Sequence, residues 1–149
     1  MNRKILAIFL LTILLTGLLP SILSQEDGKS ITIKVPAVKR ADSGLEGAVF
    51  DATVLVKPGS GRVFVDTWPL SELDTQASCR FASEVATDIL KVSHSKYDFF
   101  YTIRADSPVI GGPSAGAALT IATIASIRGL DIDPNVMMTG MISPALSWV

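Results

Sequence analysis

Alternating apolar and polar positions predict β-strands in the first half of the chain. Residues 30–35 alternate strictly, which indicates a strand with one buried face. Residues 47–57 and 62–66 are rich in β-branched and aromatic side chains, and a Pro-Gly-Ser-Gly sequence at 58–61 separates them. We therefore expect residues 48–66 to form a β-hairpin.

The second half of the chain changes to helical spacing. Apolar residues recur at the helical period over about 72–91, which predicts a helix with Ser71 as its N-cap. Aromatic and β-branched residues at 98–104 predict a further strand. Residues 114–128 are almost wholly small and aliphatic, which predicts a helix buried on most sides, and residues 136–142 predict a buried strand. This order of elements indicates an α+β or mixed α/β domain.

An apolar stretch near the N-terminus predicts the cellular location of the chain. Residues 5–23 follow a short basic flank and are mostly apolar, and small residues near Ser24 offer a cleavage site. We interpret the stretch as a cleaved signal peptide or, since it has about the minimum length of a membrane span, as an uncleaved membrane anchor. These two interpretations place the rest of the chain outside the cytoplasm, secreted or membrane-anchored. The third interpretation, which the pattern favours least, is a buried N-terminal helix of a soluble protein. We therefore divide the chain into this segment, 1–24, and a single domain, 25–149.

Composition narrows the choice of partners. The 149 residues carry a net charge of −1, which does not favour nucleic acid as a partner. The single cysteine, Cys79, cannot form an internal disulfide, and we expect it on the core-facing side of a helix. The sequence contains no phosphate-binding loop of an ATPase motor, and we expect neither a metal nor a cofactor.

The sequence Gly-Pro-Ser-Ala-Gly at 112–116 stands between an apolar stretch and the predicted buried helix. Small residues on both sides of Ser114 indicate a backbone packed closely around its hydroxyl. At the start of a helix, unpaired N–H groups and the helix dipole favour negative charge, which suits a nucleophile that generates an oxyanion. A serine at this position is also typical of an ordinary helix N-cap, and the spacing alone leaves both interpretations open.

A reactive serine needs a base, and the sequence restricts which base is available. The Gly-x-Ser-x-Gly pattern of α/β-hydrolases requires a histidine after the serine, but the only histidine, His94, precedes Ser114 in a polar loop that we expect to be solvated. The Ser-x-x-Lys pattern at 93–96 lies in the same loop without its companion motifs. A lysine whose pKa is lowered by burial remains as the base, yet the last lysine of the chain is Lys96.

Residues 107–142 resemble the proteolytic domain of the Lon family of serine peptidases. The match includes Gly-Pro-Ser-Ala-Gly at 112–116 and Met-Thr-Gly at 138–140, and the similarity extends over roughly 30–143. Among Lon-type proteins, the exported, motor-free Lon-like proteins of archaea look closest. The resemblance implies a ribosomal-S5-domain-2-like α/β architecture, assembly as a homo-oligomeric ring, and unfolded polypeptide as the substrate.

The resemblance also implies a Ser-Lys dyad endopeptidase without an ATPase motor of its own. Ser114 would be the nucleophile, and Thr139 would support the lysine amine. Backbone N–H groups of Gly111, Gly112 and Ala115 would bind the oxyanion. In the family the general-base lysine follows the serine, after a Gly-Gly segment, whereas no lysine follows the serine in this chain.

This sequence differs from the family pattern at several positions, and these differences lower the activity that we expect of the chain. Gly111 and Met141 stand where many members have an acid, and the pattern is lost beyond Pro144. We interpret the chain as a C-terminally truncated Lon-type domain, produced by a frameshift or an early stop. Without its dyad lysine we expect it to be inactive, and the alternative is a non-catalytic remnant that binds peptides or partners. An S5-like domain that binds RNA is a third class, which the acidic balance and the export signal disfavour.

Overall fold

The computed structural model describes residues 28–143, without the side chains at 39–41, 69 and 107–110. Strands, helices and two short 3-10 turns follow one another along this part of the chain. In order, they are β1 (Ile31–Ala41), β2 (Gly44–Pro58), β3 (Val63–Ser71), α2 (Leu73–Leu90), η1 (His94–Lys96), β4 (Tyr97–Ile110), η2 (Pro113–Ala115) and α3 (Gly116–Arg128).

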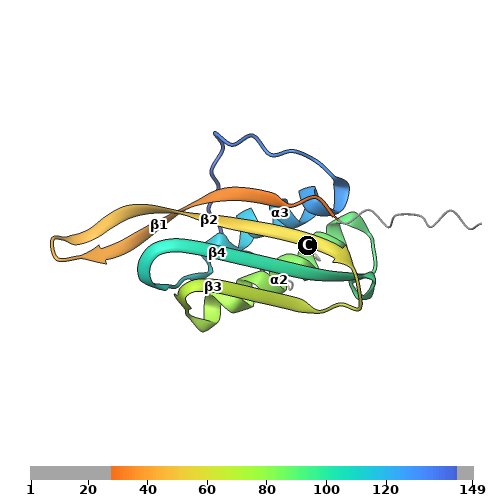
Figure 1. Cartoon of the computed structure of the whole chain (residues 1–149), viewed down its shortest axis with the longest axis horizontal. Coiled ribbons are helices and arrows are strands. Elements are labelled where there is room, and N and C mark those ends of the chain that lie inside the picture. The colour runs from red at the N-terminus through yellow and green to blue at the C-terminus, as the bar shows by residue number, and fades with distance from the viewer. Residues whose placement is uncertain (1–27, 144–149) are drawn as a thin grey trace, which may run out of the picture.

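The strands form one mixed sheet in the order β1-β2-β4-β3. β2 runs antiparallel to β1 and to β4, whereas β3, at one edge of the sheet, runs parallel to β4. α2 follows β3 and leads back to β4, which is the crossover that a parallel pair of strands needs. Both helices lie on one face of the sheet, and no described element covers the opposite face (Figure 1). The mixed α/β class expected from the sequence is therefore confirmed.

The core lies between the sheet and the two helices. Phe99, Tyr101 and Ile103 alternate along β4 and are fully buried on the helix side of the sheet. α3 contributes Leu119 and a row of alanines, so that this helix approaches β1 and β2 closely. Cys79 of α2 is buried in the same core, as the sequence predicts.

The predicted hairpin over 48–66 is wrong, because β4 lies between β2 and β3. The Pro-Gly-Ser-Gly turn passes beside the start of β4 and is bonded to it. The Gly61 N–H donates to the Tyr97 carbonyl at 2.7 Å, and the buried Asp98 carboxylate accepts the Arg62 N–H at 3.0 Å. These bonds hold the turn against β4 and carry β3 to the far side of that strand.

β1 and β2 extend beyond the rest of the sheet as a two-stranded arm (Figure 1). β1 pairs with β2 as far as Ala41 opposite Gly44, whereas β4 pairs only with residues 51–58 of β2. Gly44 closes the arm with a φ of +123°, a conformation that residues with side chains rarely adopt. The two strands are longer than the sequence pattern predicts because pairing continues beyond the alternating positions.

Both helices lie close to their predicted positions. α2 begins after Glu72, because Ser71 still pairs with Ile110 in the sheet, and so Glu72 rather than Ser71 takes the N-cap position. α3 begins at Gly116, after the tighter turn η2, and ends before Gly129 in the left-handed conformation expected of a residue that follows a helix.

The expected buried strand at 136–142 is wrong. Met137 makes one isolated parallel bridge with Lys34 of β1, and the side chains of Val136 and Met137 are each 51% exposed. The chain then turns toward the N-terminal end of α3. The apolar pattern is misleading here because no described element covers the outer side of the segment, which therefore stays outside the core.

Candidate active site

Ser114 lies in η2, between the end of β4 and the start of α3. Its side chain is exposed, and within residues 28–143 its hydroxyl has no hydrogen-bond partner. Pro113 occupies the first position of the turn, where the N–H that proline lacks would have no helical partner. The structure thus leaves the serine hydroxyl accessible beside the N-terminal end of a largely buried helix.

Thr139 and Gly140 hold the serine backbone from one side. The Gly140 N–H donates to the Ser114 carbonyl at 2.7 Å, and the Thr139 hydroxyl donates to the same carbonyl at 3.2 Å. The Ala117 N–H in turn donates to the Gly140 carbonyl at 2.9 Å. The Gly-Pro-Ser-Ala-Gly and Met-Thr-Gly sequences therefore meet in space. The role of Thr139 beside a lysine amine stays a prediction.

Two acidic residues from the start of α2 reach the other side of the turn. The Asp74 carboxylate accepts the Gly112 N–H at 2.9 Å. The Glu72 carboxylate packs so closely against Gly111 that a Cβ added there would stand 2.2 Å from Glu72 Oε2. Neither residue is identified from the sequence alone, because both are far from the serine along the chain. Their position in the first turn of a predicted helix was the only signal.

The three backbone groups expected to bind an oxyanion lie in different surroundings. The Gly112 N–H is already bonded to Asp74. Ala115 is buried within η2, and the i to i+3 bonding of a 3-10 turn directs its N–H back toward the Gly112 carbonyl. Gly111 is exposed between β4 and η2. Binding of an oxyanion by these groups stays a prediction.

His94 is not the solvated loop residue that the sequence analysis expects. It is half-buried, its Nε2 lies 2.9 Å from the Ser83 hydroxyl, and its ring stacks on Phe99 with the ring centres 4.6 Å apart. Ser83 lies in the middle of α2, whereas the Ser114 turn contacts the first turn of that helix. His94 therefore has a structural role in this fold and no contact with the serine.

No described lysine side chain forms a hydrogen bond with Ser114. Lys29 is bonded to Asp131, and Lys34 donates to Asp51 at 3.1 Å. The general base that a reactive serine needs is therefore not found next to the hydroxyl among the described side chains.

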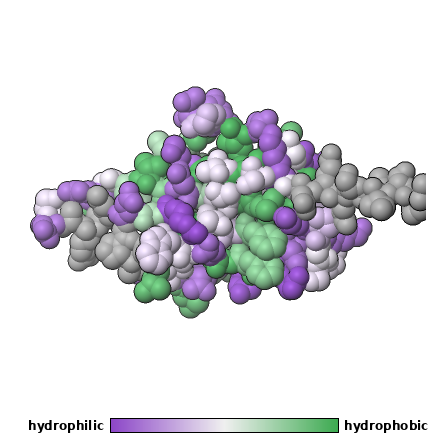
Figure 2. All heavy atoms as spheres, viewed as in Figure 1, coloured by the Kyte–Doolittle hydropathy of each residue, from purple (hydrophilic) through white to green (hydrophobic). Residues whose placement is uncertain are grey.

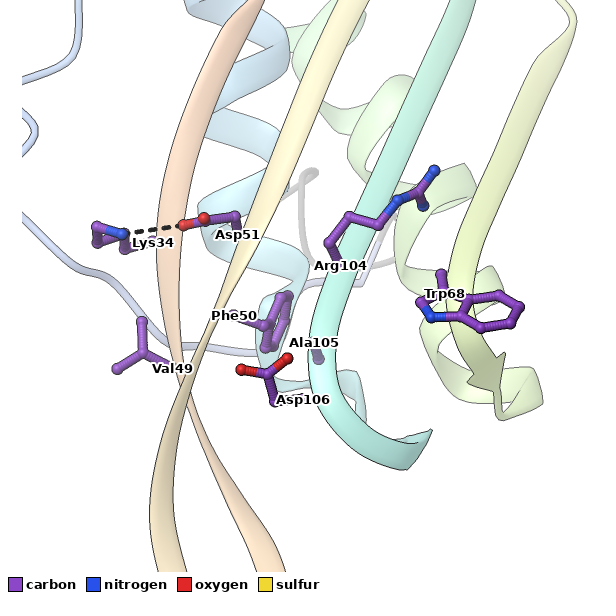
Figure 3. Close-up of a pocket in the computed structure, with 8 residues that line it drawn as sticks. All are labelled: Lys34, Val49, Phe50, Asp51, Trp68, Arg104, Ala105 and Asp106. Atoms are coloured by element: carbon purple, nitrogen blue, oxygen red, sulfur yellow. Dashed lines mark hydrogen bonds and ion pairs between the residues drawn. The ribbon is translucent and has the colours of Figure 1, made fainter.

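A separate pocket of about 310 Å³ opens where β2 and β4 separate, on the sheet face away from the helices (Figure 3). Lys34 pairs with Asp51 there, and Arg104 pairs with Asp66. The same face carries hydrophilic side chains beside a hydrophobic cluster (Figure 2). Among the described side chains that line the pocket there is no serine, cysteine or histidine, so the Ser114 turn is the better candidate for catalysis. The residues that line the pocket are Lys34, Val49, Phe50, Asp51, Trp68, Arg104, Ala105 and Asp106.

Comparisons with known proteins do not assign this chain to a family, since neither the family models nor the curated proteins that we searched contain a match.

Within residues 28–143, no group of His, Cys, Asp and Glu side chains could hold a metal ion. In the same part of the chain, neither α2 nor α3 combines the length and the apolar character of a membrane-spanning helix. The predicted signal or anchor at 1–24 lies outside the described residues.

Proposed function

We propose that the chain carries the nucleophile of a Lon-type serine endopeptidase without an ATPase motor of its own. The observation that carries the proposal is the accessible Ser114 hydroxyl beside α3, on a backbone held by Thr139 and Gly140. The two sequences that meet there are the two that resemble the family. The ribosomal-S5-like fold, unfolded polypeptide as substrate, a homo-oligomeric ring and a location outside the cytoplasm belong to the same proposal.

The proposed reaction is acyl transfer through the serine hydroxyl. A base takes the hydroxyl proton as Ser114 Oγ attacks the carbonyl carbon of the substrate. The dipole at the N-terminal end of α3, together with the Gly111 N–H, stabilises the negative charge on the carbonyl oxygen. The base then gives the proton to the leaving amine, and water hydrolyses the acyl-enzyme. Because the described side chains place no base at the hydroxyl, we expect the chain alone to hydrolyse unfolded protein slowly or not at all.

A base supplied from solution tests the proposal. The purified chain is incubated with a fluorophosphonate probe and increasing concentrations of a primary amine. The neutral amine takes the hydroxyl proton, Ser114 Oγ bonds to phosphorus, and fluoride leaves. We expect labelling to rise with amine concentration in the wild type and to be lost in Ser114→Ala.

Ser95→Ala is the matched control for this experiment. Ser95 is also exposed, and its hydroxyl lies 2.9 Å from that of Ser93, far along the chain from the turn. We expect this variant to be labelled like the wild type. Labelling that does not depend on Ser114 at any amine concentration would show that the proposed nucleophile is wrong and would favour the non-catalytic remnant.

A further inference from the structure

Asp74 joins the first turn of α2 to the turn that carries the serine. Its half-buried carboxylate accepts the Thr75 N–H at 2.7 Å through Oδ1 and the Gly112 N–H at 2.9 Å through Oδ2. Hydrogen bonds to an ionised carboxylate are roughly twice as strong as those between neutral groups. A single side chain therefore connects α2 to a residue just before Ser114.

The backbone of Gly112 makes this connection important for the serine. Gly112 has a φ of +98° and a ψ of 142°, a combination that glycine adopts far more readily than other residues. Pro113 follows, and its ring fixes the next φ. The direction in which the chain enters η2 therefore depends strongly on Gly112. Because glycine has more conformational freedom than any other residue, a contact from outside the turn is needed to hold it.

Further contacts hold the same turn in place. Ser78 lies one helical turn after Asp74 on α2, and its hydroxyl donates to the Pro113 carbonyl at 3.4 Å. On the opposite side of the turn, the Gly140 N–H donates to the Ser114 carbonyl at 2.7 Å. The turn is thus held between α2 and the C-terminal segment, and the shorter bond on the α2 side comes from Asp74.

We propose that Asp74 is a positioning residue of the Ser114 site. By accepting the Gly112 N–H, its carboxylate fixes the direction of the turn and so the place of the serine hydroxyl beside α3. The inference rests on the proposed role of Ser114 as nucleophile, and it gives Asp74 no contact with the substrate. Because a misplacement of about 1 Å can slow a reaction roughly a hundredfold, loss of this contact should slow the reaction of Ser114 about ten- to a hundredfold.

The test compares Asp74→Ala, Asp74→Asn and the control Glu84→Ala in the full chain. Glu84 is an exposed acid in the middle of α2, so its removal changes the charge of the helix equally without touching the turn. Amine-dependent labelling by the fluorophosphonate probe is measured well below the melting temperature of each variant, so that a loss of stability does not change the rate. Exchange of the Gly112 amide proton, followed by NMR, reports the contact itself.

We expect Asp74→Ala to be labelled about ten- to a hundredfold more slowly than Glu84→Ala, with faster exchange of the Gly112 amide proton. Asp74→Asn keeps an acceptor oxygen and should be intermediate in both measurements. Equal labelling of Asp74→Ala and Glu84→Ala would overturn the positioning role. Faster labelling of Asp74→Ala would also overturn it, because the carboxylate would then be withholding the Gly112 N–H from the oxyanion.

Failure of the proposed function gives a different result. If the wild type shows no Ser114-dependent labelling at any amine concentration, Ser114 is not a nucleophile and Asp74 positions no reacting group, whatever the exchange rate of Gly112. If the wild type is labelled and Asp74→Ala is labelled equally fast, only the positioning role is wrong.

Discussion

Asp98 fixes the connection between β2 and β3 through several hydrogen bonds to one carboxylate. The Arg62 guanidinium donates to Oδ2 at 2.6 Å, and the backbone N–H groups of Ser60 and Arg62 donate to Oδ1 at 2.8 and 3.0 Å. The bond from the Arg62 side chain, followed by the two backbone bonds, holds the pKa of Asp98 well below its usual range. The ionised carboxylate is therefore part of the folded structure.

Acid should weaken the fold through this residue. A lowered pKa means that Asp98 stabilises the fold above about pH 4, the pKa of an aspartate in an unfolded chain, and that this contribution is lost as the pH falls further. We expect the melting temperature of the wild type to fall more steeply below about pH 4 than that of Asp98→Asn. The exposed control Asp88→Asn should follow the wild type. Parallel curves for the wild type and Asp98→Asn would contradict the account.

Cys79 should be unreactive in the folded chain. It is fully buried in the core, and this burial raises the pKa of its thiol to about 12. Because the thiolate is the reactive form, we expect no reaction with a disulfide reagent at about pH 8 until the chain is unfolded in denaturant. Rapid reaction of the folded chain, measured by absorbance, would show that the core around this residue is open.

At the scale of single elements, local patterns locate most strands and both helices but do not identify their partners. The helix expected at 72–91 is observed as Leu73–Leu90, because its apolar spacing depends only on neighbouring residues. The hairpin expected over 48–66 fails because pairing depends on a strand some forty residues later. The prediction of a buried strand at 136–142 is wrong because burial depends on neighbouring elements, and no described element covers the outer side of this segment.

A buried hydrogen bond between two side chains joins β4 to α3. Tyr101 of β4 and Thr123 of α3 are both buried, and their hydroxyl oxygens are 2.8 Å apart. The Thr123 hydroxyl also donates to the Leu119 carbonyl at 2.7 Å, so its proton is already used. Tyr101 must therefore donate to Thr123.

Removing the donor should cost less stability than removing the acceptor. Tyr101→Phe loses one hydrogen bond, and we expect a loss of about 1 kcal/mol in the free energy of unfolding. Thr123→Val leaves the buried Tyr101 hydroxyl without a partner, and we expect a larger loss of about 1–3 kcal/mol. Chemical denaturation measures both, and a double variant that is more stable than Thr123→Val alone would support the assignment. A greater loss in Tyr101→Phe than in Thr123→Val would contradict it.

At the scale of the whole molecule, the candidate site is assembled from segments that are distant in sequence. The sequence alone singles out Ser114 and Thr139, because each lies in a recognisable short motif. It does not single out Asp74, since a carboxylate in the first turn of a helix usually reflects only the helix dipole. The packing of α2 against η2 gives this residue its contact with Gly112, and that packing depends on the complete arrangement of sheet and helices.

The most direct test of the account is to locate the probe on the chain. After treatment with the fluorophosphonate and a primary amine, the chain is digested and its peptides are analysed by mass spectrometry. We predict a phosphonyl adduct on Ser114 that grows with amine concentration. An adduct confined to another serine, such as Ser83 or Ser95, or no adduct at any amine concentration, would contradict the assignment of Ser114 as the nucleophile.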